Sequence, residues 1–344
     1  MGQLPTVDDV ARIAGVSRQT VSNVLNTPAI VKETTRTRVQ AAISELGYRP
    51  HASARRLRTQ KSSTIGIRME GYKDGVSGAV LDRFLHSLTE EADARDMRIL
   101  LYTAATPEEE IEQFARLRDG ADVDALVLTS TFHNDPRTEW LLENRMPFVT
   151  FGRPWGIDDI NDPSHLWVDI DGIAGMRDAA VHLRNEGARR IGFIGWPSPS
   201  GTGDERRQGW REGSGLSDED AVALSIATTN DVAEGTKAAL ELLSRTDPPD
   251  ALLCASDSLA LGARLADHEI PIIGYDNTPV ASALGLSSVD QPLAEAAAST
   301  LDLLFGPSGS DIRSLNEEPK HRLLAPRLVV RRSTHLAPGE TTGT

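Results

Sequence analysis

Three amphipathic segments open the chain, and their apolar residues recur with the three- and four-residue spacing of helices. The apolar positions of the first two segments are Val10, Ile13, Ala14, Val21, Val24 and Leu25. Those of the third are Val39, Ala42, Ile43 and Leu46, followed by Gly47, a residue type that ends helices. Ala14-Gly15-Val16 predicts a tight corner between the first two helices. The pattern therefore predicts a small three-helix domain.

Polar residues stand where these helices should begin. Thr6 precedes the first apolar-periodic segment and Ser17 precedes the second. Because their side-chain oxygens can accept hydrogen bonds from otherwise unpaired backbone amides, we expect both residues to act as N-caps.

Beyond residue 62 the pattern changes to short apolar runs alternating with amphipathic stretches. The strand-length runs are 64–67, 98–102, 125–128, 148–151, 166–170, 191–194, 251–254 and 271–275. Stretches such as 80–95, 172–187 and 232–245 have helical periodicity. This alternation predicts an α/β fold with parallel sheets, whose ligands bind at the carboxyl ends of the strands.

Charge separates the two regions. The whole chain is acidic, with 36 basic and 50 acidic side chains and a net charge of −14. The first 62 residues, however, hold ten basic and four acidic side chains, so they carry +6 and the remainder carries −20. We therefore expect the N-terminal domain to be attracted to phosphates that the rest of the chain repels.

The second helix has the side chains of a DNA-reading element. In a helix-turn-helix, this helix directs its first residues at base edges in the major groove, which here are Arg18, Gln19 and, one turn later, Asn23. Arginine pairs with guanine, and glutamine or asparagine pairs with adenine. The short hydrogen-bonding residues expected at phosphates are Thr6, Ser17, Thr20, Ser22 and Asn26. For each polar residue, the alternative is a plain cap or surface position.

A basic segment follows Pro50. Five positive side chains lie between Arg49 and Lys61, with no acid and with Leu57 as the one large apolar residue. A helix this short is marginal in water, so we expect it to order against DNA. Leu57 would then insert as a wedge between base steps in the minor groove. The alternative is that Leu57 packs on the body or on a partner chain.

Other chemistry finds little support in the sequence. The glycine-rich Ser200-Gly-Thr-Gly203 lacks the spacing of a phosphate-binding loop, and the eight histidines form no HExxH motif. The single cysteine, Cys254, lies in an apolar run and has no second cysteine with which to pair. Because we find no apolar run of eighteen residues and no cleavable signal, we expect a cytoplasmic protein that does not enter a membrane. The motifs above also lead us to expect no metal and no cofactor.

The order and spacing of several motifs resemble the LacI/GalR family of bacterial transcriptional repressors over nearly the whole chain. The motifs are the N-terminal three-helix domain, which we call the head, Tyr48-Arg49-Pro50, Ala54-Arg55-Arg56-Leu57-Arg58, 63–67, 167–172, 182–195, 204–212, 254–262, 273–279 and 288–292. The resemblance implies that a dimer binds a pseudo-palindromic operator and inserts paired leucines at its centre. Leu57 occupies the matching position, with Ala54, Arg55 and Arg58 as further DNA contacts. Lys32 departs from the family, which often caps the third helix with Ser or Thr.

The family also implies the domain plan. A helix-turn-helix domain at 1–48 and a hinge helix at 49–62 would precede an α/β core at 63–335, which resembles periplasmic binding proteins and has two Rossmann-like lobes. The N-lobe would hold 63–155 and 290–318, and the C-lobe 159–284 and 326–335. Crossovers are expected near 153–159, 284–292 and 315–326, and a disordered tail at 336–344.

In the cleft between such lobes, Arg206 matches the family's effector arginine and Asp276 lies at a strand end, so together they suit a polyol. The other expected effector contacts are Arg153, Asn230, Ser256, Thr129 and Trp196. Trp196 or Trp155 would offer a flat surface to the apolar face of a sugar. The alternatives are a core position for each tryptophan and, for Asp257, a supporting or helix-capping role.

These observations predict a homodimeric repressor that a sugar-like effector releases from its operator. The alternatives are a regulator that needs a corepressor such as a purine, a sugar-binding protein without DNA regulation, and an enzyme on the same fold. The last would need a catalytic constellation, and the sequence displays none.

Overall fold

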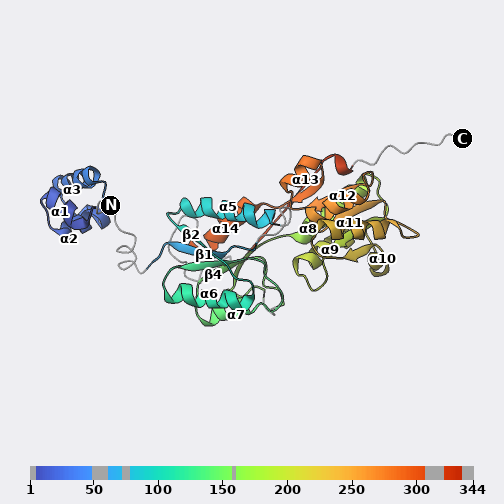
Figure 1. The fold of residues 1–344 in the computed structure, drawn as a ribbon, viewed down its shortest axis with the longest axis horizontal. Coiled ribbons are helices and arrows are strands. Elements are labelled where there is room, and N and C mark those ends of the chain that lie inside the picture. Colours follow the sequence, from blue (N-terminus) through green and yellow to red (C-terminus); the bar gives the residue numbers. More distant parts are fainter. Residues whose placement is uncertain (1–4, 49–60, 72–77, 157–159, 307–320, 335–344) are drawn as a thin grey trace. The chain divides into compact units, whose positions relative to one another are not determined.

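A computed structural model describes residues 5–48, 61–71, 78–156, 160–306 and 321–334 (Figure 1). The chain divides into two compact units, Met1–Ser62 and Ser63–Thr344. Each is described separately below.

The first unit contains the three expected helices, α1 (Val7–Ala14), α2 (Arg18–Asn26) and α3 (Glu33–Leu46), with a short 3-10 turn at Pro28–Ile30. Both predicted N-caps are confirmed. Thr6 forms a capping box with Asp9, and the Ser17 hydroxyl accepts from the Thr20 amide at 3.1 Å. Gly15 ends α1 with a φ of +61°, the left-handed conformation that glycine adopts without strain. The head therefore begins and ends its helices by local chemistry that the sequence displays.

The core of this unit is smaller than the apolar pattern suggests. Val10, Ala14, Val21, Val24 and Val39 are among its buried residues. Two expected core residues are instead exposed, Ile13 by 40% and Leu25 by 37% of their surface, because each lies at the edge of its helix's apolar stripe. Lys32 precedes α3 without making a side-chain cap, in keeping with its departure from the family pattern.

The second unit contains two six-stranded sheets, and all eight predicted strands are present. The first sheet consists of β1 (Thr64–Arg68), β2 (Arg98–Tyr102), β3 (Ala125–Leu128), β4 (Phe148–Phe151), β5 (Leu166–Ile170) and β11 (His321–Leu324). Its order is β11-β5-β4-β3-β1-β2, and its strand pairs are parallel. Side chains alternate between its faces. Ala125 and Val127 pack with α5 (Ala79–Asp93) and α14 (Leu293–Phe305), whereas Leu126 and Leu128 pack with α6 (Pro107–Asp119) and α7 (Pro136–Glu143).

The second sheet has the order β12-β10-β9-β8-β6-β7 and is parallel except for β12. Its strands are β6 (Ile191–Gly195), β7 (Ser225–Ala227), β8 (Ala251–Cys254), β9 (Ile272–Tyr275), β10 (Ser287–Asp290) and β12 (Arg327–Val329). Its helices are α8 (Gly172–Asn185), α9 (Thr202–Ser214), α10 (Asp218–Ala223), α11 (Val232–Leu243), α12 (Asp257–Ala266) and α13 (Pro279–Leu284). We call the two sheets with their helices the first lobe and the second lobe.

The chain passes between the lobes at points that differ from the expected lobe boundaries. We expected the first crossing at 153–159, but 166–170 forms β5, which pairs with β4 and β11 in the first sheet. The first crossing therefore lies between β5 and α8. The second, between β10 and α14, and the third, between β11 and β12, lie within the ranges expected for them, at their C-terminal ends, so the second lobe extends past 284 and the first lobe past 318. Family motifs locate strands well, but pairing decides which sheet a strand joins.

Two glycines allow α9 to lie close against α8. A Cβ at Gly209 would be 2.2 Å from the Ile173 carbonyl oxygen, and one at Gly213 would be 2.5 Å from that of Arg177. Their spacing of four residues places both on one face of α9. This contact fixes the helix that carries Arg206. Within the described residues, we find no helix both long and apolar enough to cross a bilayer.

Candidate functional site

The polar residues of α2 form an exposed row of amides and hydroxyls. The Gln19 side chain donates to Asn23 Oδ1 at 3.0 Å, one turn along the helix. Asn26 donates to the Ser22 backbone oxygen at 2.6 Å. These contacts hold the amides along the helix surface, where hydrogen-bond groups of DNA can replace their present partners.

The other predicted DNA contacts of the head lie at the starts of α1 and α2. Arg18 is exposed, with Asp8 3.8 Å away as its ion-pair partner, and Ser17 and Thr20 pair their hydroxyls at 2.9 Å. Thr6 donates its hydroxyl to Asp9 at 2.7 Å while accepting from the Asp9 amide. Hydrogen bonds from Thr6 and Arg12 lower the pKa of Asp9 to about 2. The structure thus assigns Thr6 a structural cap. Ala54, Arg55, Leu57 and Arg58 lie outside the described residues.

In the second lobe, Arg206 is held at the centre of a polar and aromatic cluster. The residue lies on α9 and is 5% exposed. Its guanidinium stacks 3.7 Å from the centre of the Tyr275 ring and 5.2 Å from that of Trp196. One nitrogen donates to the Ala255 backbone oxygen at 2.6 Å. The ring contacts and the carbonyl fix the plane of the guanidinium, so its remaining N–H groups have a defined direction.

Asp276 lies directly after β9, 3.6 Å from the same guanidinium. Its carboxylate also accepts from the Gln291 amide at 2.8 Å. Its backbone φ is +106°, an unusual conformation for a residue other than glycine, which the Asp276 N–H bond to Val289 helps to hold. Burial raises the pKa of Asp276 to about 7, although Arg206 pulls in the opposite direction. The carboxyl therefore titrates near neutral pH.

Several buried polar atoms around this cluster have no hydrogen-bond partner in the described chain. They are Arg206 Nε, Trp196 Nε1, the Tyr275 hydroxyl and, in the first lobe, the Thr129 hydroxyl. Buried polar atoms are normally paired, and leaving one unpaired costs about 1–3 kcal/mol. Three such atoms around one guanidinium indicate groups that await a ligand or ordered water.

Arg153, from the loop after β4, bridges the two lobes. Its Nε donates to Asp169 on β5 at 2.9 Å, and a second nitrogen pairs with Glu205 on α9. Burial raises the pKa of Asp169, and it raises that of Glu205 to about 7. Trp155 follows on the same loop and lies against Gly201, where a Cβ would be 2.5 Å from its ring. Glu205, directly before the predicted Arg206, is thus an interlobe ion-pair partner that sequence reasoning missed.

Ser256 and Asn230 meet as a pair in the second lobe. The Ser256 hydroxyl donates to Asn230 Oδ1 at 2.5 Å and also caps α12. Asp257 accepts from the Thr278 amide and the Ser288 hydroxyl, both at 2.6 Å, so it ties α12 to the segments on either side of α13. Asp257 therefore has the supporting role weighed as its alternative.

A cavity of about 510 Å³, the interlobe cavity, lies between the lobes. It is lined by the end of β1 and the start of α5, together with Thr129 directly after β3 and Pro279 and Val280 from α13. Of the predicted effector contacts, Thr129 is among the residues that line this cavity, whereas Arg206, Asp276 and Trp196 meet one another in the second lobe. The partners that the sequence reading missed are Asp169, Glu205, Tyr275 and Gln291. The sequence signal for these residues was their position, because Asp169 and Tyr275 lie near the carboxyl ends of strands and Glu205 and Gln291 lie beside predicted contacts or crossings.

Comparison with known proteins covers both units. Residues 6–51 match the family described as bacterial regulatory proteins, lacI family, and residues 180–334 match a periplasmic binding protein-like domain. The HTH-type transcriptional regulator AglR of Rhizobium meliloti is 33% identical, over 96% of this chain and 94% of its own. The regulator CelR of Thermobifida fusca is also 33% identical, over 96% and 98%.

Solved structures agree with these matches. A transcriptional regulator CelR–cellobiose complex has a TM-score of 0.67 and 30% identity, with 96% of this chain and 99% of that chain covered. The lac repressor dimer bound to operator and an anti-inducer has a TM-score of 0.76 at 22% identity, with 97% and 100% covered, which shows a shared fold.

Proposed function

The chain belongs to the LacI family of bacterial regulatory proteins, and from that premise we propose that it is a repressor released from its operator by a sugar-like effector bound between the lobes. Its place of action would be the cytoplasm, and its assembly a homodimer on a pseudo-palindromic site.

The reading head supports the DNA half of this proposal. Arg18, Gln19 and Asn23 lie in the first turns of α2, the second helix of the helix-turn-helix, which in this motif enters the major groove. All three belong to residue types that discriminate bases by paired hydrogen bonds. The excess of positive charge over the first 62 residues supplies attraction to the phosphates.

The single observation that carries the effector half is the cluster of unpaired buried donors around Arg206. Arg206 Nε and Trp196 Nε1 can only donate, the Tyr275 hydroxyl can donate or accept, and the Asp276 carboxylate can only accept when ionised. Vicinal hydroxyls both donate and accept, so a sugar satisfies this mixture. Trp196 adds a ring face for the apolar side of a pyranose. The solved CelR–cellobiose complex, whose chain is similar to this one, contains a ligand of this class.

The ion pair between Arg153 and Glu205 suggests how binding would reach the DNA. Arg153 belongs to the first lobe and Glu205 to the second, next to Arg206. A ligand that engages Arg206 therefore acts beside a contact that resists lobe movement. Regulation requires only that the effector bind the DNA-competent and incompetent conformations unequally.

The test combines ligand screening with one substitution. Sugars, sugar phosphates and nucleobases are screened by thermal shift, where a ligand at a hundredfold excess over its Kd stabilises by about 2.7 kcal/mol. In Arg206→Ala, we expect operator affinity to stay at the wild-type value while effector-driven release is lost.

Arg211→Ala is the matched control, because Arg211 lies on the same helix with an exposed side chain and pairs with Asp218 rather than with the cluster. If the wild-type effector concentration still releases the Arg206→Ala protein from its operator, the role of Arg206 in effector binding is refuted. A response to nucleobases and to no sugar would instead identify the corepressor alternative.

A further inference from the structure

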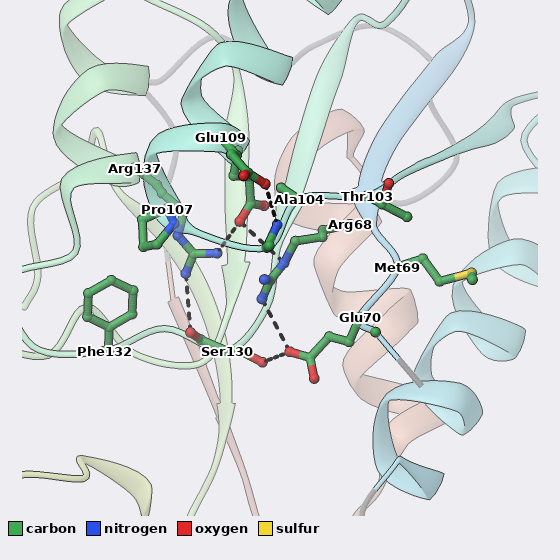
Figure 2. Close-up of a pocket in the computed structure, with 13 residues that line it drawn as sticks. Arg68, Met69, Glu70, Thr103, Ala104, Pro107, Glu109, Ser130, Phe132 and Arg137 are labelled. Atoms are coloured by element: carbon green, nitrogen blue, oxygen red, sulfur yellow. Dashed lines mark hydrogen bonds and ion pairs between the residues drawn. The ribbon is translucent and has the colours of Figure 1, made fainter. Parts of the chain in front are cut away.

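A second cavity, of about 800 Å³, opens at the carboxyl ends of β1, β2 and β3 in the first lobe (Figure 2). We call it the outer cavity. Its wall includes Arg68 at the end of β1 and Glu70 after it, Thr103 after β2, and Phe132 on the loop after β3. It shares 68–71 with the interlobe cavity, so the two spaces meet at the end of β1.

The arginines of the outer cavity are already neutralised. Arg137 pairs with Glu110 at 2.7 Å and with Asp135 at 2.6 Å. Arg68 lies 3.2 Å from Glu70 and 3.3 Å from Glu110. Figure 2 shows this network as one continuous chain from Arg137 through Ser130 and Glu70 to Arg68. Neither arginine is therefore available to compensate an anionic ligand, and the nearby carboxylates would repel one.

What the wall offers instead suits a neutral polyol. Phe132 exposes 41% of its surface at the cavity and is backed by the Arg137 guanidinium, 5.5 Å from its ring centre. Glu70, Glu109 and the Thr103 hydroxyl supply polar groups around it. A cavity lined by an aromatic ring and by hydroxyl and carboxylate groups matches the apolar face and hydroxyl rim of a pyranose.

Strand order sets the distance between the two cavities. Thr129 on the interlobe cavity follows β3, and Thr103 on the outer cavity follows β2, with β1 between them. Neighbouring strands are about 4.8 Å apart, so each strand step advances a ligand by about one sugar ring. A ligand lying along this edge of the sheet would occupy both spaces.

We propose, on the basis of the proposed function, that the effector is a neutral oligosaccharide of at least two rings, with its outer ring bound in the outer cavity against Phe132. The inner ring would lie in the interlobe cavity beside Thr129, and its contact with Arg206 and Asp276 is the part taken from the proposed function. Binding therefore selects for length and against a phosphate at the outer end.

Calorimetry on the full-length chain tests this inference. The probes are glucose, galactose, cellobiose, maltose, melibiose, raffinose and glucose 6-phosphate. We expect at least one oligosaccharide to bind more than about tenfold tighter than its constituent monosaccharides. Phe132→Ala should weaken that oligosaccharide about 2- to 12-fold, the range for loss of an aromatic contact, and leave monosaccharide affinity unchanged.

Two further variants separate a site effect from a folding effect. Leu142→Ala is the matched control, because Leu142 is similarly exposed at 37% but does not line the cavity. Ala104→Trp fills the outer cavity from the opposite wall and should reproduce the selective loss. Equal affinity for oligosaccharides and monosaccharides, a preference for glucose 6-phosphate, or indifference to both cavity variants would overturn the outer ring site.

Failure of the outer ring site can be distinguished from failure of the proposed function. If Arg206→Ala abolishes sugar binding while Phe132→Ala and Ala104→Trp change nothing, the effector site stands and the outer cavity is rejected. If no sugar binds the wild-type chain, the sugar-effector proposal itself is rejected.

Discussion

At the residue scale, Asp276 links ligand chemistry to pH. Its carboxyl has a pKa of about 7 in the fold against an ordinary value near 3.8, with burial as the largest cause. Between those values the folded chain holds a proton that the unfolded chain has released, so this group makes the free energy of unfolding fall as pH rises from about 4 to about 7. Above that window both states are ionised, and the contribution stops changing.

Ligand affinity should move in the opposite direction. The ionised carboxylate accepts through both oxygens and forms stronger, charge-assisted hydrogen bonds with sugar hydroxyls than the protonated acid does, so we expect effector affinity to rise up to about tenfold between pH 6 and pH 8, as the ionised fraction grows. Calorimetry over this range measures the change. Because Glu205 also titrates near pH 7, Glu205→Gln is the control that should leave the dependence in place. A flat profile in both proteins would contradict a role for ionised Asp276.

The same scale shows why some site residues were predictable and others were not. Arg206 and Asp276 stand out because the family motif fixes their positions. Tyr275 and Gln291 do not, because their importance comes from which strand ends the sheet brings beside α9. Thr6 was predicted both as a cap and as a phosphate contact, and its hydroxyl is engaged by Asp9.

At the element scale, the hydrophobic period identified the helices of the head and the strands with continuous apolar runs, among them the edge strand β2. The strands β7, β10, β11 and β12 escaped it, and β10 did so although its first three residues are buried, because its sequence is Ser-Ser-Val-Asp. Edge strands such as β7 and β11 have partly exposed residues, so their sequences lack the continuous apolar runs of central strands. The misplaced first crossing has a related cause, since periodicity reports burial and not the neighbour to which a strand pairs.

The basic segment before β1 also belongs to this scale, and its prediction rests on sequence. If Leu57 is a wedge, Leu57→Ala should weaken operator binding far more than binding to unrelated DNA, because only the specific complex gains from a kinked centre. Fluorescence anisotropy at fixed salt compares the two affinities. Equal losses on both DNAs would mean that Leu57 has another role.

At the scale of the whole molecule, the first lobe offers a surface for a second copy. β2 is an edge strand, and beside it a groove of about 390 Å³ is lined by Leu85, His86, Thr89, Glu90, Ile99 and Leu101. Leu101 exposes 47% of its surface there. An exposed apolar edge of this kind is normally covered, and a symmetric partner would cover it with the same elements.

If the chain forms the proposed homodimer through this edge, we expect Leu101→Arg to make it monomeric at micromolar concentration and to weaken operator binding, because each half-site would then be bound alone. Sedimentation velocity measures the state. Leu240→Arg, at an exposed position on α11 of the second lobe, is the matched control. A Leu101→Arg protein that remains dimeric would move the interface elsewhere.

The three passages of the chain between the lobes leave only one or two residues between the elements that they join, namely Asp171, 291–292 and 325–326. Connecting segments this short cannot extend, and three of them together resist both separation and sliding of the lobes. Together they form a hinge that bends but does not lengthen. A bound effector can therefore be transmitted chiefly as an angle between the lobes, and the operator-binding end would respond to rotation rather than to separation.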